Sequence, residues 1–556
     1  MKGDFARVTF DPSRHFSQVF QQQGRVQLES DWNEQGAIGL YLLRTMVTDL
    51  VGSCWAAGAG FSITRQNLLA NWQLSPGHFY VDGILCQNDM ACTVATQPYA
   101  PTPGNGFDLA EPPPGFVVWL DVWERHLSAI EAPSILDSAL EGVDTATRAQ
   151  VVWQLRLTDS AALGPQLDAL AVALKLRAGG DLSDAEKAAL QQQINDLAAL
   201  RRSLDAGQGD PCTILRAVLN ARATYAWPRL RAQAGPADSD DDPCVIAADA
   251  RYRGLENQLY RVEIHDGASI GPNGAAVGAT FKWSRENGSV IFPVTGAAAA
   301  SAQDGSPQLV VTLGSLGRDQ RLGLAANEWV EVLDDNITLS QFAAPLLQVV
   351  AIDAASRTVT LQGLKGDTIA LPSLDPGKHA LVRRWDQQDG VSSDGVLPVA
   401  EGGWITLEDG LQVWFEPGGA YATGDYWQVP ARVAGNGSLD WPSTNGAPDA
   451  VKSRGMHHRA ALGVSTLRAN YTECCCRIVS LCDQLRAAGA AKKTTPGTVA
   501  PAPSSPLTPA VPTKTTRTTV KATKAAKATK ATKATRTTAT KATKAAKATK
   551  ATRKSR

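Results

Sequence analysis

The 556-residue chain is predicted to be mainly β, with several antiparallel sandwich-like or barrel-like units. The chain is rich in turn-forming and aromatic residues, with 48 glycines, 31 prolines and 14 tryptophans. Many short runs of Val and Ile alternate with polar residues and end at Gly, Pro, Asn or Asp, as strands and their turns do. Three segments depart from this pattern: an N-terminal helix, an inserted antiparallel helical hairpin, and a basic C-terminal tail that we expect to be disordered.

The length predicts several domains, because a single core rarely serves more than about 250–300 residues. Changes of pattern along the chain give their expected boundaries. These are a strand-helix segment at 1–55, a β domain at 56–158, a helical hairpin insertion at 159–206, a β region continuing the core domain at 207–300, a second β domain at 301–435, a C-terminal extension with a short helix at 436–490, and a Pro/Thr then Lys/Ala/Thr-repeat tail at 491–556.

The N-terminal segment contains "GRVQLESDWNEQGAIGLYLLRTMVTDLVG" at 24–52. We expect a short strand followed by a helix that is capped at Asp31, with Glu34 three residues on. Its expected apolar face consists of Ile38, Leu42, Met46 and Leu50.

Strand patterns dominate from residue 61 to residue 432. Each run is short, is apolar or alternating, and is bounded by turn residues, which favours sandwich or small-barrel units. The runs are "HFYVDGILC", "GFVVWLDVWERHL", "AQVVWQLRL", "NQLYRVEIH", "ATFKWSRENGSVIFPV", "QLVVTLGSL", "NEWVEVLDD", "LLQVVAIDAASRTVTLQG", "GWITLEDGLQVWFE" and "GDYWQVPAR".

The helical hairpin is expected within 159–206. Leucines in its first half recur at helical spacing, "AGGDLSDAEK" supplies a glycine C-cap and a turn, and Ser183 with Glu186 forms a capping box before the second helix. Because it is inserted between β segments, the hairpin is expected to protrude as an arm, and a packing role is favoured over partner binding.

The stretch "ARYRGLENQLYRVEIHDG" (250–267) concentrates acids, bases and an imidazole, as an active site does. Its period of two instead predicts a half-buried strand with apolar and charged side chains on opposite faces. The buried face would carry Tyr260, Val262 and Ile264, and the outward face Arg261, Glu263 and His265. Catalysis by Glu256 or His265 is the less favoured alternative, and Glu256, which precedes the alternation, stays unexplained.

Asn287-Gly288, in the following "TFKWSRENGSVIF", is a strong short-range signal for a β-hairpin. Both residues adopt positive φ readily, as the central positions of a tight hairpin turn require. We therefore expect the strands on either side to pair.

No motif of a known catalytic class accompanies the charged stretch. The sequence contains no G-x-S-x-G elbow, no phosphate loop, no H-E-x-x-H and no paired CxxC. "DTATRAQ" at Asp144 shares only two letters with an acid protease and precedes an ordinary strand. We therefore expect a protein without enzymatic activity and without a cofactor.

The nine cysteines are odd in number and unevenly spaced, which favours free buried thiols over a disulfide framework. Cys212 and Cys244 both follow Asp-Pro, and a bond between them is the alternative.

"GMHHRAALG" and "ECCCRIVSLCDQL" bring His457 and His458 together with four cysteines, as a zinc site does. Three adjacent cysteines do not form the usual CxxC knuckle, so an apolar helix stripe is favoured over a metal site. That stripe would consist of Cys474, Ile478, Leu481, Cys482 and Leu485.

The basic tail and the acidic remainder of the chain carry opposite net charges. Residues 491–556 contain 17 Lys or Arg and no Asp or Glu, and of the 54 basic and 54 acidic residues this leaves 37 basic against 54 acidic, a difference of −17, for residues 1–490. Phosphate neutralisation without base reading is the predicted role; a solubilising repeat and a tether to the acidic body are the alternatives. The residues expected to bind a polyanion are Lys514, Arg517, Lys521, Lys524, Lys527, Lys530, Lys533, Arg536, Lys541, Lys544, Lys547, Lys550, Arg553, Lys554 and Arg556.

Several long motifs together resemble an uncharacterised bacterial domain family associated with phage-tail-like contractile injection systems and their baseplate or fibre proteins. They include "MKGDFARVTFDPSRHFSQVFQQQGRVQLESDWNEQ", "VWLDVWERHLSAIE", "DDPCVIAADARYRGLENQLYRVEIHDG", "ATFKWSRENGSV" and "TGDYWQVPAR". The resemblance runs from Met1 to about Asp483 and omits the tail. "ECCCRIVSLCDQL" departs from the family's "DCR" and Pro-rich end, and the family supplies no catalytic residues to carry over.

The resemblance implies a structural or assembly component of a contractile injection particle, in its baseplate, cage or fibres, with other particle components as partners and an oligomeric state. A DNA-associated protein that binds through its tail is one alternative. A glycan or peptidoglycan hydrolase or binding module, with Glu256 and Glu263 as its acids, is the other. Because no apolar run approaches the roughly 20 residues of a membrane span and the start lacks a secretory signal, we expect a cytoplasmic protein, released only within a particle.

Overall fold

The mainly β fold predicted from the sequence is confirmed. The structure, a computed structural model, describes residues 1–65, 72–100, 115–180, 182–208, 210–235, 251–267, 269–270, 276–319, 321–434, 437–467, 470–480 and 482–486. These residues lie within one packed unit, Met1–Gly489. The predicted tail, with every residue expected to bind a polyanion, lies outside the described residues.

One antiparallel sheet, in the order β29-β28-β7-β8, separates two cores. Val118 and Leu120 of β7 contribute to a core with Trp153 of β8, whereas Val117 belongs to the core on the other face of the sheet. The alternation along "GFVVWLDVWERHL" thus buries side chains on both faces. The strands are β7 (Phe116–Leu127), β8 (Arg148–Asp159), β28 (His458–Leu467) and β29 (Asn470–Glu473).

Two smaller sheets complete the first core, together with Phe61 and Phe79. In the first, β1 pairs with the late strand β30 in parallel and with β4 antiparallel. Its order is β30-β1-β4-β5, with β1 (Cys54–Ala57), β4 (Gly77–Val81), β5 (Ile84–Asn88) and β30 (Cys476–Ile478). The second is β2-β3-β6, with β2 (Ile63–Arg65), β3 (Trp72–Leu74) and β6 (Cys92–Thr93).

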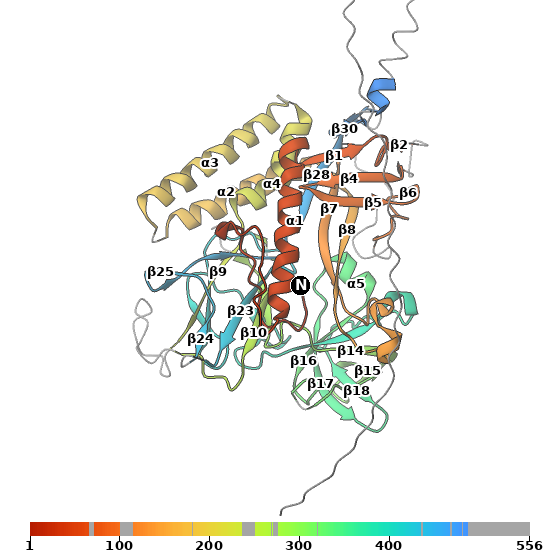
Figure 1. Cartoon of the computed structure of the whole chain (residues 1–556), viewed down its shortest axis with the longest axis vertical. Coiled ribbons are helices and arrows are strands. Elements are labelled where there is room, and N and C mark those ends of the chain that lie inside the picture. Colours follow the sequence, from red (N-terminus) through yellow and green to blue (C-terminus); the bar gives the residue numbers. More distant parts are fainter. Residues whose placement is uncertain are drawn as a thin grey trace, which may run out of the picture. The chain divides into compact units, whose positions relative to one another are not determined.

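Three helices cover the other face of the β7–β28 sheet: α2 (Leu163–Ala178), α3 (Asp184–Asp205) and α4 (Pro211–Tyr225). The antiparallel hairpin of α2 and α3 and its Ser183–Glu186 capping box are as predicted, and the two helices lie side by side in Figure 1. The third helix, α4, was missed by the sequence interpretation, although Asp210 caps it and Pro211 occupies its first turn. The leucines of these helices are buried against the sheet, so the hairpin has the packing role that was favoured, and the prediction that it protrudes as an arm is wrong.

A sandwich of two sheets forms the second half of the fold. Tyr260, Val262 and Ile264 of β10 face Val413 and Phe415 of the opposite sheet in one core. The first sheet has the order β20-β13-β10-β23-β24, with β10 (Gln258–Asp266), β13 (Thr280–Ser284), β20 (Leu397–Pro398), β23 (Tyr426–Arg432) and β24 (Ser438–Leu439). The second has the order β21-β22-β9-β27, with β9 (Arg229–Ala234), β21 (Trp404–Thr406), β22 (Leu411–Phe415) and β27 (Val451–Lys452).

The Asn287-Gly288 turn leads out of the sandwich. Both residues have positive φ, 52° and 68°, as predicted. The predicted hairpin is wrong, because β13 pairs with β10 and β20, whereas β14 (Ile291–Ser301) pairs with β15 and β19. The turn is therefore the crossover from the sandwich to the next unit.

That unit is a closed antiparallel barrel in the order β14-β15-β18-β17-β16-β19. Its interior is aliphatic, with Leu309, Val330 and Val359 fully buried. The predicted domain boundary between residues 300 and 301 falls inside β14. The other strands are β15 (Pro307–Leu313), β16 (Trp329–Leu333), β17 (Leu346–Asp353), β18 (Thr358–Gln362) and β19 (Leu381–Trp385).

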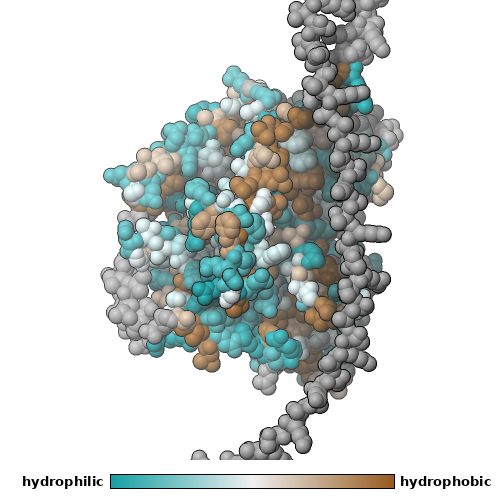
Figure 2. Space-filling view, in the orientation of Figure 1, coloured by the Kyte–Doolittle hydropathy of each residue, from teal (hydrophilic) through white to brown (hydrophobic). Residues whose placement is uncertain are grey.

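The N-terminal helix α1 spans Glu29–Val51 and departs from prediction in three respects. Residues 24–28 form no strand, and the N-cap is Leu28, without a side-chain cap, so that Asp31 lies inside the helix. Of the predicted apolar face only Ile38 is buried, whereas Leu42, Met46 and Leu50 are 48%, 52% and 77% exposed. Figure 2 shows hydrophobic residues gathered on the side of the molecule where Figure 1 draws α1.

The remaining elements are short: α5 (Asp335–Ser340), β11 (Ser269–Ile270), β12 (Ala276–Val277), β25 (Ser443–Thr444), β26 (Ala447–Pro448), and the 3-10 turns η1 (Pro12–Arg14), η2 (Pro133–Ile135), η3 (Ser138–Leu140), η4 (Ser160–Ala162) and η5 (Pro376–Lys378). Residues 482–486 are helical in the predicted C-terminal extension. Among the described helices, none combines the length and the apolar character that a bilayer crossing needs.

Candidate functional site

The charged side chains of β10 lie in the interior of the protein. Arg261, Glu263 and His265 are 3%, 3% and 8% exposed. The prediction that they form an outward face is therefore wrong. A period of two separates the two faces of a strand, but it does not indicate whether water or a second layer of protein covers the polar one.

Ion pairs connect this face of β10 to the barrel. Lys282 of β13 lies 3.7 Å from a Glu263 carboxylate oxygen, and its Nζ donates to Glu331 of β16 at 2.7 Å. Arg261 donates from Nε to Glu263 at 2.5 Å, and Lys2 pairs with Glu263 at 2.9 Å. We call Lys2, Arg261, Glu263, His265, Lys282 and Glu331 the buried charged cluster.

Aromatic rings close the same cluster. The Lys282 ammonium lies 4.5 Å from the ring centroid of Trp385, which is fully buried and donates from Nε1 to Glu331 at 3.2 Å. The Arg261 guanidinium lies 3.5 Å from the ring of Tyr426. These cation–π contacts are strongest where water is excluded, as it is here.

Burial and neighbouring charge set the protonation states of the cluster. Burial alone would raise the pKa of Glu263, but the charges of Lys2, Arg261 and Lys282 hold that pKa far below its usual value. Burial lowers the pKa of His265 to about 4, helped by the charge of Lys282, and lowers the pKa of Lys2 to about 7. His265 is therefore a neutral imidazole near neutral pH, held in an ionic junction between the sandwich and the barrel.

Asn287 fastens the first residues of the chain over this junction. Its side-chain amide donates to the carbonyl oxygens of Met1 and Gly3 at 3.0 and 2.9 Å, and its Oδ1 accepts from Gln428 at 3.0 Å. The asparagine that gives the turn its positive φ also positions the segment that covers the cluster.

Glu256 lies apart from Glu263, in a cavity of about 630 Å³ lined by residues 4–7, Glu29, 256–259, Glu286, Arg321 and Arg432. Its half-exposed carboxylate pairs with the guanidinium of Arg321, which also pairs with Glu286. Burial, with the charges of Asp4 and Asp386, raises the pKa of Glu286. The acid pair expected for a hydrolase, Glu256 with Glu263, is therefore not brought together, and Glu256 has the structural partner that the sequence did not reveal.

A second cavity, of about 510 Å³, lies between the hairpin of α2 and α3 and the β9 sheet. Its wall includes Arg177, Arg229, Arg231 and Lys452, and Glu416 accepts ion pairs from Arg231 at 2.6 Å and from Arg177 at 3.8 Å. No local motif indicated this site, because its basic residues come from a helix and two strands that are far apart in the sequence.

The two adjacent histidines bind different aspartates. His457 Nδ1 lies 3.0 Å from Asp121, and its ring stacks on Trp123, whereas His458 Nδ1 lies 2.7 Å from Asp82. Burial would raise the pKa of Asp121, but His457 lowers it to about 2. Within the described residues, no group of three or more His, Cys, Asp or Glu is arranged to hold a metal ion.

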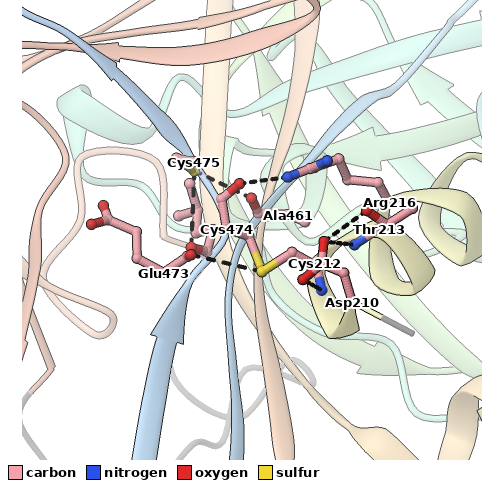
Figure 3. Close-up of a disulfide and its surroundings, with 9 residues drawn as sticks. Asp210, Cys212, Thr213, Arg216, Ala461, Glu473, Cys474 and Cys475 are labelled. Atoms are coloured by element: carbon pink, nitrogen blue, oxygen red, sulfur yellow. Dashed lines mark hydrogen bonds between the residues drawn. A yellow bond between two sulfur atoms is a disulfide. The ribbon is translucent and has the colours of Figure 1, made fainter. Parts of the chain in front are cut away.

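The cysteine-rich segment contains a disulfide where free thiols were expected. Cys474 follows β29 and bonds to Cys212 in the first turn of α4, with their Cα atoms 5.0 Å apart (Figure 3). The alternative bond from Cys212 to Cys244 is therefore wrong, and Cys244 lies outside the described residues. The predicted helix stripe of Cys474, Ile478, Leu481, Cys482 and Leu485 is also wrong, because Ile478 belongs to β30, and Leu481 lies outside the described residues.

The surroundings of the disulfide fix both of its ends. Asp210 accepts from the backbone N–H groups of Cys212 and Thr213 and so sets the start of α4. Arg216, one turn on, donates to the carbonyl oxygen of Cys474 at 2.8 Å (Figure 3). The bond thus joins the helical layer to the edge of the sheet that it covers.

Comparison with known proteins identifies a family and finds distant structural likenesses. The structure published as "Crystal structure of TssK" matches 72% of this chain and 99% of its own, with 8% identity and a TM-score of 0.15, a score too low to carry any argument. No curated protein matches the chain. DUF6519, described as a family of unknown function, matches residues 1–550, and so extends past Asp483, where the resemblance in sequence was expected to end, into the tail. The chain belongs to the DUF6519 family.

Proposed function

We propose that this protein is a structural or assembly component of a phage-tail-like contractile injection particle. The observation that carries the proposal is the exposed apolar surface of α1 and of the segment before it. Trp32 and Leu50 at the two ends of this surface are 80% and 77% exposed, and Phe20 and Val26 ahead of the helix are 78% and 82% exposed. Contiguous apolar patches of this kind mark surfaces that bind other proteins.

The charged motifs support an architectural role. The acids and bases of β10 neutralise one another inside an ionic junction, and each histidine of the 457–458 pair is held by its own aspartate. These contacts position sheets and strands. The contractile-particle assignment itself rests on the motif resemblance described above.

Native particles provide the test. The tagged full chain is expressed in its own cells, and particles are purified by density gradient and analysed by mass spectrometry. We expect the chain in intact sheath-and-baseplate assemblies. Its absence from them would overturn the proposal.

A matched pair of variants connects that result to the surface. Leu43→Asp places a charge on α1, where Leu43 is 52% exposed, and Leu255→Asp places the same charge at a leucine that is 95% exposed elsewhere. Incorporation into particles should be lost for the first and kept for the second. Equal incorporation of both would exclude α1 as the assembly surface.

We also propose that the tail binds a polyanion, because 17 basic and no acidic residues occupy 491–556. A chain ending at residue 490 should lose the affinity of the full chain for duplex DNA, and the full chain should show a steep decrease of affinity with salt concentration. Undiminished DNA binding by the shortened chain would contradict this role.

A further inference from the structure

We propose that the exposed face of α1 binds the same face of a second copy of this chain, with the two helices antiparallel. The resulting homodimer would be the unit that enters an assembly. This inference rests on the proposed assembly role, and it is tested below on the purified chain alone.

The exposed residues of α1 follow the spacing of a coiled-coil seam. Side chains that recur at intervals of four, three, four, three and four residues lie along one stripe of a helix. All six residues at these positions are exposed and none is charged. They are Trp32, Gly36, Gly39, Leu43, Met46 and Leu50.

The opposite side of α1 holds the helix on its own chain. Ile38 is buried, Arg44 makes a two-pronged ion pair with Glu124 at 2.9 and 3.1 Å, and Glu34 accepts from Thr9 at 2.6 Å. Tyr41, also on this side, packs against Phe10. The polar side of the helix therefore faces the body, and the apolar seam is left to solvent.

The seam is complementary to itself only in the antiparallel arrangement. A two-fold axis that crosses the seam at the level of residue 41, on the side of α1 away from the Tyr41 ring, places seam residues that are equally distant from residue 41 opposite one another. Gly39 then meets Leu43, Gly36 meets Met46, and Trp32 meets Leu50, so that each glycine receives a long side chain. A parallel pair would place glycine on glycine and tryptophan on tryptophan.

The two glycines provide open space for the second helix. A Cβ atom added at Gly36 or Gly39 would have no heavy atom within 4 Å, so nothing in the described part of the chain occupies these positions. Knobs from a partner helix fit such positions, and small residues allow two backbones to approach closely.

The rims of the seam also favour a second copy. Leu40 and Leu42, 41% and 48% exposed, lie on opposite edges of the seam next to the axis, so each would meet the same residue of the second copy. Asp49 would meet the uncharged Gln35 of the second copy. No like charges are opposed. Including the rims, six large apolar side chains of this face are at least 41% exposed.

Sedimentation of the full chain over a range of concentrations measures the self-association. We expect a reversible dimer for the unmodified chain, at least a ten-fold higher dissociation constant for Leu43→Asp, and no change for Leu255→Asp. A chain that stays monomeric at all concentrations would overturn the inference; its presence in particles would still support the assembly role.

Gly39→Leu separates packing between copies from folding of one copy. The open space at Gly39 accommodates the new side chain within a monomer, and leucine favours the helix more than glycine does. The layer of residue 39 against Leu43 would become overpacked, so the dissociation constant should rise at least ten-fold while thermal stability is kept. An unchanged dissociation constant would count against the seam.

Thiol cross-linking tests the orientation. In the background for this test, Cys476→Ser and Cys482→Ser remove the thiols that are exposed within the described residues, and Cys244→Ser removes the thiol that lies outside them. In this background Leu42→Cys lies beside the two-fold axis. The two copies of Leu50→Cys would be about 27 Å apart at 1.5 Å per residue. A short bismaleimide should therefore link Leu42→Cys chains and leave Leu50→Cys chains unlinked. The reverse pattern would exclude the antiparallel dimer.

Discussion

The charged face of β10 is buried and the apolar face of α1 is exposed to solvent, which reverses the usual arrangement. Glu263 and Arg261 are buried at 3% exposure, whereas Trp32 and Leu50 are at least 77% exposed. Charged side chains are rarely buried unless they are paired, and a large apolar surface that its own chain leaves exposed marks a site where another molecule binds. The first region is complete within one chain, and the second is the surface for which we propose a partner.

Removal of one charge from the cluster is the largest expected perturbation of the buried region. Lys282→Met leaves Glu331 and Glu263 with fewer counter-charges in the interior and should lower the free energy of unfolding by about 3–5 kcal/mol. Urea unfolding at neutral pH measures it. Arg318→Met, at a surface pair with Asp319, is the control and should cost no more than about 1 kcal/mol. An equally small decrease in the free energy of unfolding for Lys282→Met would mean that the buried ion pairs are not needed for stability.

The pH dependence of stability provides a second test of the buried charged cluster. His265 has a native pKa of about 4, below the value of about 6.5 in the unfolded chain, so folding releases its proton. The contribution of neutral His265 to the free energy of unfolding is fully present above pH 6.5. It is lost as the pH falls from 6.5 to 4 and below. At about 1.4 kcal/mol per pKa unit this amounts to about 3.5 kcal/mol at most.

His265→Gln should flatten the stability profile between pH 6.5 and 4. The buried His126, whose pKa burial lowers to about 3, contributes in the same direction and remains as a background in both proteins. Denaturant midpoints measured at each pH give the slope. Equal slopes for the two proteins would mean that His265 titrates normally in the folded state.

The smallest effect is expected on the exposed side of α1. Met46→Ala removes a half-exposed side chain and should change the stability of the monomer by no more than about 0.5 kcal/mol, whereas Ile38→Ala on the buried side of the same helix should cost about 2–5 kcal/mol. Unfolding at a protein concentration well below the dimer dissociation constant makes the comparison. A large loss for Met46→Ala under those conditions would show that its own chain covers the seam.

Local signals in the sequence predicted local structure well. The Ser183–Glu186 capping box, the alternation of β10 and the positive φ at Asn287 and Gly288 are all present, because each depends on a few neighbouring residues. The strand pairing at that turn could not be predicted in the same way, because the partners of β14 follow it in the barrel. The predicted buried face of α1 was also wrong, since the sequence contains an apolar face but does not show which side of the helix the rest of the chain covers.

The sequence identified the charged residues of β10 in the candidate site, but neither their partners nor their burial. The sequence located Arg261, Glu263 and His265, but their partners Lys2, Lys282 and Glu331 lie on other elements, and burial was decided by the barrel and the N-terminal residues together. Glu256 pairs with Arg321, which the chain supplies 65 positions later. Contacts at such separations leave no periodic trace in a single sequence.

The disulfide between Cys212 and Cys474 spans 262 positions of the chain and closes a covalent ring around them. All strands of both sandwich sheets, and the whole barrel, lie within that ring. A single protease cut anywhere inside it would leave the two fragments in one molecule until the bond is reduced. Electrophoresis with and without reductant after limited proteolysis would therefore report whether a cut lies inside the ring.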